Sequence, residues 1–219
     1  MLPISNLKMA MVPSAAITIL PRILNIAHQR FPNLNLLLEE TDSVNALNLM
    51  LDKKCQIALI RTPQDTSFLA ESGLNYRELQ RHPIKLIVSS DHELAKRDEV
   101  LLSELKNERF ISHHKVHSAS LHFLFEKACF YEGFTPQSIC EGSELHTILT
   151  LVSHNIGVGI MPMDILEVSN SFNVKALDIK NQKLESSITI IWGDSFYLDS
   201  LIEEVIQIIN PCEKELILH

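Results

Sequence analysis

Serine side chains stand at two points where a predicted strand gives way to a predicted helix. Ser14 follows the apolar run Leu7–Val12, and Ser43 follows the strand-like segment Leu34–Glu40. Serine is a preferred helix N-cap, and the first turn of a helix offers unpaired N–H donors that attract anions. Because strand-end turns line the clefts of α/β proteins, we expect Ser14 and Ser43 both to cap helices and to contact a ligand.

Arg61 ends a predicted buried strand, directly after four apolar residues. Its guanidinium can bind a carboxylate through two parallel hydrogen bonds, and Thr62 is its neighbour in the chain. We therefore expect a small organic acid, aromatic or short aliphatic, to bind against Arg61, Thr62 and the two serines. The alternative is that Arg61 forms an ion pair with Glu39, Glu40 or Asp65 and never meets the ligand.

The second half of the sequence holds a similar set of polar groups. Ser112 and His113 follow a short predicted strand, and Ser143 with Glu144 precedes a predicted helix. We expect Ser143 to cap that helix. All four residues are predicted to line the opposite wall of a ligand cleft.

Patterns typical of catalysis or metal binding are missing from the sequence. It contains no GxSxG, no HExxH and no phosphate loop, and has only six glycines with which to build one. Of the neighbouring histidines, only His113 and His117 have helical spacing, and both fall in a predicted loop. Glu39 and Glu40 alternate along a strand and so point to opposite faces. We predict no enzymatic activity, no cofactor and no metal site.

The four cysteines, Cys55, Cys129, Cys140 and Cys212, show neither CxxC nor zinc-ribbon spacing. Lys127 is the only cation beside Cys129 in the sequence, so a reactive thiolate is not indicated there. We expect no disulfide and no redox switch, which fits a reducing cytoplasm.

Composition narrows the class of partner. The 219 residues carry 27 acidic against 19 basic side chains, a net charge of -8, which disfavours binding of phosphate backbones by this chain. No apolar run is long enough for a membrane helix, and residues 1–8 lack the pattern of a secretory signal. These features favour a cytoplasmic protein that has no membrane contact and does not itself bind DNA.

Strand and helix patterns alternate with short turns over residues 7–60, which predicts βαβ units and a parallel sheet covered on both faces. A second α/β unit follows, including a helix over Ser120–Tyr131 that ends at Gly133. The chain finishes with a strand, Ile188–Trp192, and a helix, Leu198–Ile209, which need a partner sheet.

The economical solution returns this last strand and helix to the first unit. We therefore predict an α/β fold of two Rossmann-like lobes joined by a two-crossing hinge. Lobe I comprises residues 1–79 and 182–219, and lobe II comprises residues 80–181. The ligand cleft is expected between the lobes.

Eight segments, in this order and spacing, resemble the effector-binding domain of LysR-type transcription regulators. They are Leu7–Ser14, Ile19–Arg22, Phe31–Leu34, Leu38–Glu40, Gln56–Arg61, Val88–Ala95, Glu132–Pro136 and Leu151–Pro162. The resemblance covers about residues 7–210. It departs from the family at Lys53-Lys54, where a glycine is usual, and at Gln56, where an aspartate is common.

The resemblance implies a type 2 periplasmic-binding-protein-like fold and effector contacts at Ser14 and Ser43. Some members that sense aromatic acids carry an arginine at the place of Arg61, whereas Ser120 stands where peroxide sensors have their cysteine. The family's winged helix-turn-helix has no counterpart here, and we expect it to precede these residues in a longer protein that binds DNA. Alternatives are a transporter's solute-binding protein of the same fold, or a small enzyme on that scaffold.

Two predicted helices carry more apolar residues than one sheet can cover. On the first helix, one face is assigned to the core, namely Ile17, Leu20, Leu24, Ala27 and Phe31. The leftover stripes are Ile19, Ile23, Ile26 and Arg30 on the first helix, and Phe123 and Phe130 on the helix of the second lobe. They predict a two-fold antiparallel homodimer, or a homotetramer built from it. The alternative is a broader core covered by loops.

Overall fold

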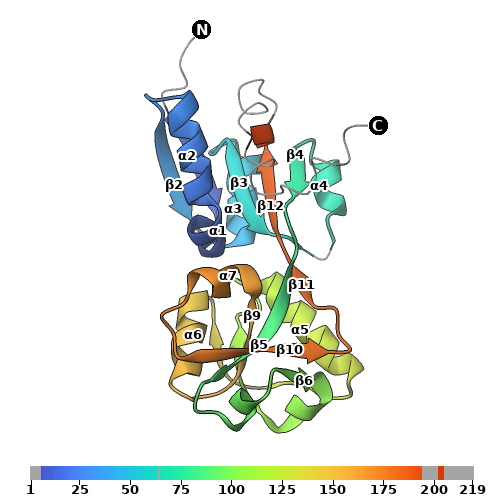
Figure 1. The fold of residues 1–219 in the computed structure, drawn as a ribbon. Helices are drawn as coiled ribbons and strands as arrows, with labels where there is room; N and C mark the ends of the chain where they lie inside the picture. Colours follow the sequence, from blue (N-terminus) through green and yellow to red (C-terminus); the bar gives the residue numbers. More distant parts are fainter. Residues whose placement is uncertain (1–5, 64, 194–201, 205–219) are drawn as a thin grey trace, which may run out of the picture. The chain divides into compact units, whose positions relative to one another are not determined.

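The computed structural model describes residues 6–63, 65–193 and 202–204 (Figure 1). The chain divides into two units, of which unit 1 comprises residues 1–81 and 187–219 and unit 2 comprises residues 82–186. The backbone therefore passes between the units twice, after Arg81 and after Ser186. Each unit has its own sheets and its own hydrophobic core.

Unit 1 is built on one five-stranded sheet in the order β2-β1-β3-β12-β4. Its elements are β1 (Asn6–Met11), α1 (Pro13–Thr18), α2 (Leu20–Arg30), β2 (Asn35–Glu40), α3 (Ser43–Leu51), β3 (Ile57–Arg61), α4 (Ser67–Glu71), β4 (Asn75–Glu78) and β12 (Ile188–Trp192). The strands β1, β2 and β3 are parallel, as predicted, but β12 runs antiparallel to both of its neighbours. The sheet is therefore mixed.

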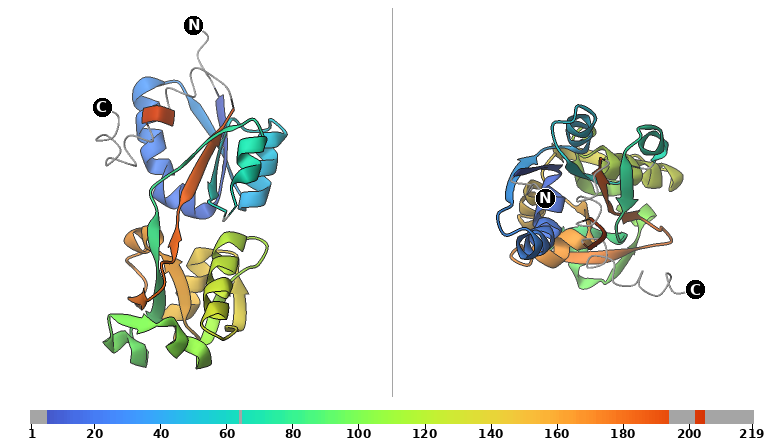
Figure 2. Two further views of the ribbon diagram at one scale, coloured as in Figure 1. Left: turned by 90° about the vertical axis from the view of Figure 1, so that its right-hand side faces the viewer. Right: turned by 90° about the horizontal axis from the view of Figure 1, so that it is seen from above.

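Helices cover both faces of this sheet, with α1 and α2 on one side and α3 and α4 on the other (Figure 2). Met9, Met11 and Leu59 belong to the core cluster under α1 and α2. Ala10 and Ile60 belong to the cluster on the side of α3. All residues of β3 are buried, which explains why this strand is a continuous apolar run in the sequence.

The first predicted helix is interrupted, and this interruption corrects the predicted dimer stripe. The helix breaks at Ile19 because Pro21 has no N–H to donate and its ring clashes with the preceding turn. The break rotates α2 so that Ile23 and Ile26 face inward. Ile19, Ile23 and Ile26 are at most 6% exposed and pack in the core of unit 1, so their assignment to a dimer interface is wrong.

Ile17 on the first helix and Ile202 on the last predicted helix lie in different surroundings. Ile17, which was assigned to the core, is 37% exposed. The side chain of Arg30 lies outside the described part of the structure. Of the predicted last helix, only residues 202–204 are described, and they are helical, with Ile202 in the core of unit 1.

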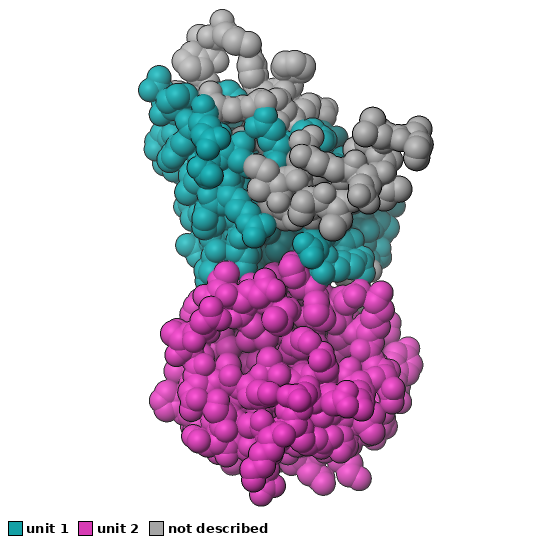
Figure 3. Space-filling model, viewed as in Figure 1, with its two compact units in different colours: residues 1–81, 187–219 teal, residues 82–186 magenta. Residues whose placement is uncertain are grey.

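Unit 2 (magenta in Figure 3) contains a mixed sheet and a separate parallel pair of strands. Its elements are β5 (His82–Ser89), η1 (Glu93–Lys96), β6 (Glu99–Leu101), η2 (Leu102–Asn107), β7 (Arg109–His113), α5 (Ala119–Tyr131), β8 (Gln137–Gly142), α6 (Leu145–Ser153), β9 (Gly159–Pro162), α7 (Met163–Val168), β10 (Val174–Lys180) and β11 (Glu185–Ser186). The sheet has the order β11-β5-β10-β6, with β9 also on β5, and β7 pairs with β8.

Two turns in the structure bear on the sequence pattern. Helix α5 ends as predicted before Gly133, whose φ of 80° lies in the left-handed region that glycine tolerates best. Lys53 stands where the LysR family usually has glycine, yet it also adopts a left-handed φ of 56°. The turn before β3 is therefore kept without glycine.

Candidate functional site

The carboxyl ends of β1, β2 and β3 lie at one edge of the sheet in unit 1, because these three strands are parallel neighbours. The backbone continues this alignment past the strands, since Val12 N–H donates to Leu59 O at 3.0 Å and Thr41 N–H donates to Met11 O at 2.9 Å. The edge therefore collects the first turns of α1 and α3 and the end of β3, where three of the predicted ligand contacts stand.

Ser43 and Arg61 are directly connected at this edge. The Arg61 backbone N–H donates a hydrogen bond to Ser43 Oγ at 3.2 Å. The prediction that Ser43 caps α3 is wrong. The N-cap residue is Asp42, whose side chain accepts from Asn45 N–H at 2.9 Å. Arg61 itself is only 6% exposed, so a full positive charge is held inside unit 1 at the end of β3.

Ser14 also proves to lie inside a helix rather than at its cap. Val12 is the N-cap residue of α1, Pro13 begins the helix, and no side chain caps it. Ser14 is 5% exposed, and its carbonyl oxygen accepts from Thr18 Oγ1 at 2.8 Å. The capping prediction for Ser14 is wrong because proline, whose missing N–H costs nothing at the first helical position, begins the helix one residue earlier.

Thr62 belongs to a chain of hydrogen bonds that sequence analysis did not predict. Its hydroxyl lies 2.9 Å from Thr189 Oγ1 and 2.8 Å from Ser187 Oγ, and Ser187 Oγ lies 2.6 Å from Glu78 Oε1. A carboxylate only accepts, so Ser187 gives its single hydrogen to Glu78 and accepts from Thr62, which in turn accepts from Thr189. Arg81 completes the chain with a two-point ion pair to Glu78, at 2.7 and 2.9 Å.

These hydrogen bonds connect β3, β4 and β12 close to the two points where the backbone passes between the units, after Arg81 and after Ser186. Their signal in the sequence is weak: Ser187 and Thr189 alternate with isoleucines in the last strand. That alternation shows which face the hydroxyls occupy but does not identify their partners.

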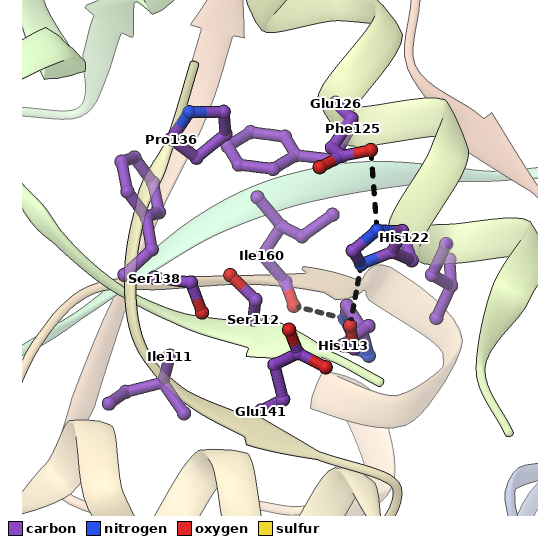
Figure 4. A pocket seen from close by; sticks show the side chains of 12 residues that line it. Ile111, Ser112, His113, His122, Phe125, Glu126, Pro136, Ser138, Glu141 and Ile160 are labelled. Atoms are coloured by element: carbon purple, nitrogen blue, oxygen red, sulfur yellow. Dashed lines mark hydrogen bonds and ion pairs between the residues drawn. The ribbon is translucent and has the colours of Figure 1, made fainter. Parts of the chain in front are cut away.

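In unit 2, the predicted residues Ser112 and His113 line a pocket between α5 and the strands β7 and β8 (Figure 4). His113 is 2% exposed, and its Nε2 donates to Ile160 O at 3.0 Å, since a carbonyl only accepts. Sequence analysis missed His122, Glu126 and Glu141 in the same wall. The spacing of His122 and Glu126, one helical turn apart, is the signal that could have paired them.

Ser143 and Glu144 are both exposed and lie outside this pocket. Glu144, not Ser143, is the N-cap residue of α6, and no side chain caps that helix. The predicted cap is therefore wrong. The backbone carbonyl of Ser143 instead accepts a hydrogen bond from Ser118 Oγ at 3.0 Å.

Two buried thiols and the arrangement of the acidic groups bear on redox chemistry and metal binding. Burial raises the pKa of Cys55 to about 11 and that of Cys129 to about 12, which keeps both thiols protonated. In the described ranges, no group of three or more His, Cys, Asp or Glu side chains is arranged to hold a metal ion. No described helix is long and apolar enough to cross a membrane.

Comparison with known proteins identifies the family. The family described as "LysR substrate binding domain" matches residues 3–211, and the chain belongs to it. Among sequence relatives, the uncharacterized regulator YwbI of Bacillus subtilis is 26% identical over 88% of this chain, and the regulator AlsR of the same organism is 25% identical over 91%. The chain spans 62% and 64% of their respective lengths.

Solved structures share the fold. The effector-binding domain of QuiR, in complex with shikimate, matches with a TM-score of 0.80 and 17% identity, covering 94% of this chain and 97% of that one. The effector-binding domain of a BenM variant matches with a TM-score of 0.81 and 20% identity over 96% of both chains. The predicted family and two-lobed α/β fold class are confirmed.

Proposed function

We propose that this chain is the effector-sensing domain of a LysR-type transcription regulator and that it binds a small organic acid at the strand-end edge of unit 1. The carrying observation is the 6% exposure of Arg61 at the end of β3, beside the first turn of α3. A guanidinium held in the protein interior is well suited to a carboxylate. Ser14 and Ser43, at the same edge, are the proposed neighbours of that carboxylate.

The names of related structures support an organic acid as the ligand of this domain. The QuiR domain was solved with shikimate and the BenM domain with its effector benzoate, and both ligands are carboxylates. The curated relatives are named as transcription regulators. We infer that this domain binds its ligand without converting it and acts in the cytoplasm. The contacts predicted for Thr62, Ser112, His113, Ser143 and Glu144 stay predictions.

Titration calorimetry with a panel of aromatic and short aliphatic carboxylates tests the site. Arg61→Ala should weaken acid binding by about a hundredfold or more, because losing a buried charge-assisted pair costs about 2–5 kcal/mol. Arg22, which is exposed on α2, offers the matched control. Arg22→Ala should bind the acid at full strength. Unchanged acid binding by Arg61→Ala would refute the assignment.

We further propose that ligand binding to this domain is transmitted to DNA-binding domains attached to it in the full regulator. We also propose that the domain self-associates as a homodimer or homotetramer. Phe123 and Phe130 on α5 are 53% and 74% exposed and are the proposed contact residues. Phe130→Asp should shift the protein to monomer in sedimentation velocity, whereas Phe68→Asp, on the exposed face of α4, should not. An unchanged oligomer with Phe130→Asp would exclude this surface.

A further inference from the structure

Unit 2 contains a pocket whose walls all come from this unit. It lies between the N-terminal half of α5 and the strands β7 and β8, and its space, open mouth included, is about 450 Å³ (Figure 4). The enclosed part is about 60 Å³, so a ligand would lie partly in the open mouth. Its lining residues all belong to unit 2, whereas Ser14, Ser43 and Arg61 belong to unit 1.

One side of the pocket is apolar. Phe110 and Phe125 contribute rings whose centroids are 5.3 Å apart at an interplanar angle of 56°, and Leu121, Pro136 and Ile160 extend this surface. Such a wall removes the organic part of a ligand from water. It also presents aromatic rings, whose faces attract cations.

The other side is polar and carries acidic groups but no lysine or arginine. Glu126 and Glu141 bring two carboxylates, and Ser112 and Ser138 bring two hydroxyls. The Ser138 hydroxyl donates to Cys140 O at 3.2 Å. Within the described residues, the side chains of Ser112 and Glu141 have no hydrogen bond or ion pair. Figure 4 shows both on the same side of the pocket.

Hydrogen bonds to backbone carbonyls fix the two histidines of this wall. His122 Nδ1 lies 2.8 Å from His113 O and must donate to it, which aims Nε2 at Glu126 Oε2, 3.3 Å away. His113 Nε2 donates to Ile160 O. Glu126 thus has an imidazole beside it, which forms an ion pair only when the ring is protonated. Glu141 has no ion-pair partner among the described residues. The pocket joins an uncompensated carboxylate, a hydroxyl and an aromatic surface.

We propose that this pocket is a second ligand site, which takes a small organic ammonium ion: a primary amine carrying one apolar ring or short chain. The ammonium group forms a charge-assisted hydrogen bond with Glu141 and a second hydrogen bond with Ser112 Oγ. The apolar part packs on Phe125 and Phe110. An acid in unit 1 and an amine in unit 2 are thus recognised by opposite charges.

Three probes of one shape test the charge preference: benzylamine, benzyl alcohol and benzoate. Titration calorimetry on the whole chain, in buffer of fixed ionic strength near pH 7, should show benzylamine binding at least tenfold more tightly than benzyl alcohol. Glu141→Gln should remove that advantage and leave the weak binding of benzyl alcohol. Glu167→Gln, at an exposed position on α7 outside the pocket, is the matched control and should bind benzylamine normally.

A second variant locates the amine independently of charge. Ser112→Ala removes the hydroxyl without adding volume to the pocket, and should weaken benzylamine several-fold. Equal binding of benzylamine and benzyl alcohol, or full binding by Glu141→Gln, would overturn the proposal. Failure here differs from failure of the acid site. Arg61→Ala should weaken carboxylate binding and leave benzylamine binding unchanged, whereas Glu141→Gln should weaken benzylamine binding and leave carboxylate binding unchanged.

Discussion

In unit 1, the hydroxyl groups beside the end of β3 bond to one another and to the backbone, whereas in unit 2 the Ser112 hydroxyl near the end of β7 faces a pocket. Thr62 lies between Thr189 and Ser187, and Ser43 accepts from Arg61 N–H. Ser112 lines open space together with Glu141. The same residue types at similar strand ends thus hold the structure together in one unit and remain available to a ligand in the other.

The charges of the two regions differ in the same way. Unit 1 buries a guanidinium, Arg61, at its strand ends, while the polar wall in unit 2 is acidic. In a chain with a net charge of -8, a buried positive group is the exception. This contrast is the reason for assigning an acid to one region and an amine to the other, and the experiments below test it from the larger expected effect to the smaller.

Among the glycines of unit 2, Gly157 lies closest to neighbouring backbone, so an added methyl group should disturb the structure most there. A Cβ at Gly157 would lie 2.6 Å from Arg109 O, on the strand β7 that carries Ser112 and His113. Gly157→Ala should therefore cost about 3 kcal/mol of unfolding free energy, since backbone atoms must move. Denaturant titration followed by the near-UV signal measures this loss.

Gly193 provides the control in unit 1. A Cβ there meets nothing within 4 Å, and its φ is not in the left-handed region. Gly193→Ala should change the unfolding free energy by less than about 0.5 kcal/mol. Equal effects of the two alanines would show that β7 and the segment before β9 are not packed as closely as the structure has them.

Two substitutions that each remove one hydroxyl without adding volume test the comparison of hydroxyls directly. Thr62→Val should destabilise the protein by about 2 kcal/mol, because it leaves the hydroxyl of Thr189, which is 1% exposed, without its described partner. Ser112→Ala should cost less than about 0.5 kcal/mol, because its hydroxyl faces a pocket. Chemical denaturation measures both. A larger cost for Ser112→Ala than for Thr62→Val would reverse our assignment of structural and binding roles.

The sequence predicts the strands of unit 1 well because β1 and β3 are apolar runs covered on both faces. It also predicts that Arg61 and the serines share one edge, since parallel strands end together. It does not predict the break at Ile19, because a helical stripe continues through Pro21 when the period alone is followed. That single break reverses which isoleucines are buried.

The sequence also does not show which of two adjacent residues caps a helix. Ser43 and Asp42 are both good N-caps, and only the geometry of the turn selects Asp42. The pocket in unit 2 depends on Glu141 and Ser138 in β8, a strand with mostly exposed residues and no apolar pattern. Long-range pairings such as that of Thr62 with Thr189 leave no local signal.

The assignment of the cap of α3 leads to a smaller effect in unit 1. Asp42→Ala should cost about 1 kcal/mol, because it removes the acceptor for Asn45 N–H. Ser43→Ala removes only the long 3.2 Å contact to Arg61 N–H and should cost less. It should nevertheless weaken acid binding in calorimetry if Ser43 contacts the ligand. A larger loss of stability for Ser43→Ala than for Asp42→Ala would return the cap to Ser43.

The smallest effect is expected from peroxide and reductant, and the thiols show why. Burial raises the pKa of Cys55 to about 11 and that of Cys129 to about 12. Near pH 8 only about one Cys129 thiol in ten thousand is then a thiolate, the form that reacts. Cys140 is only half-buried.

In a Cys212→Ser background, Ellman's reagent should label Cys140 at least a hundredfold faster than Cys55 or Cys129, and denaturant should make the three rates equal. Because two of these thiols are unreactive for the same reason in different units, melting temperature should not depend on dithiothreitol or on low peroxide. Rapid native labelling of Cys129, or a peroxide-dependent shift that Cys129→Ser abolishes, would show that unit 2 opens at α5 far more readily than its packing indicates.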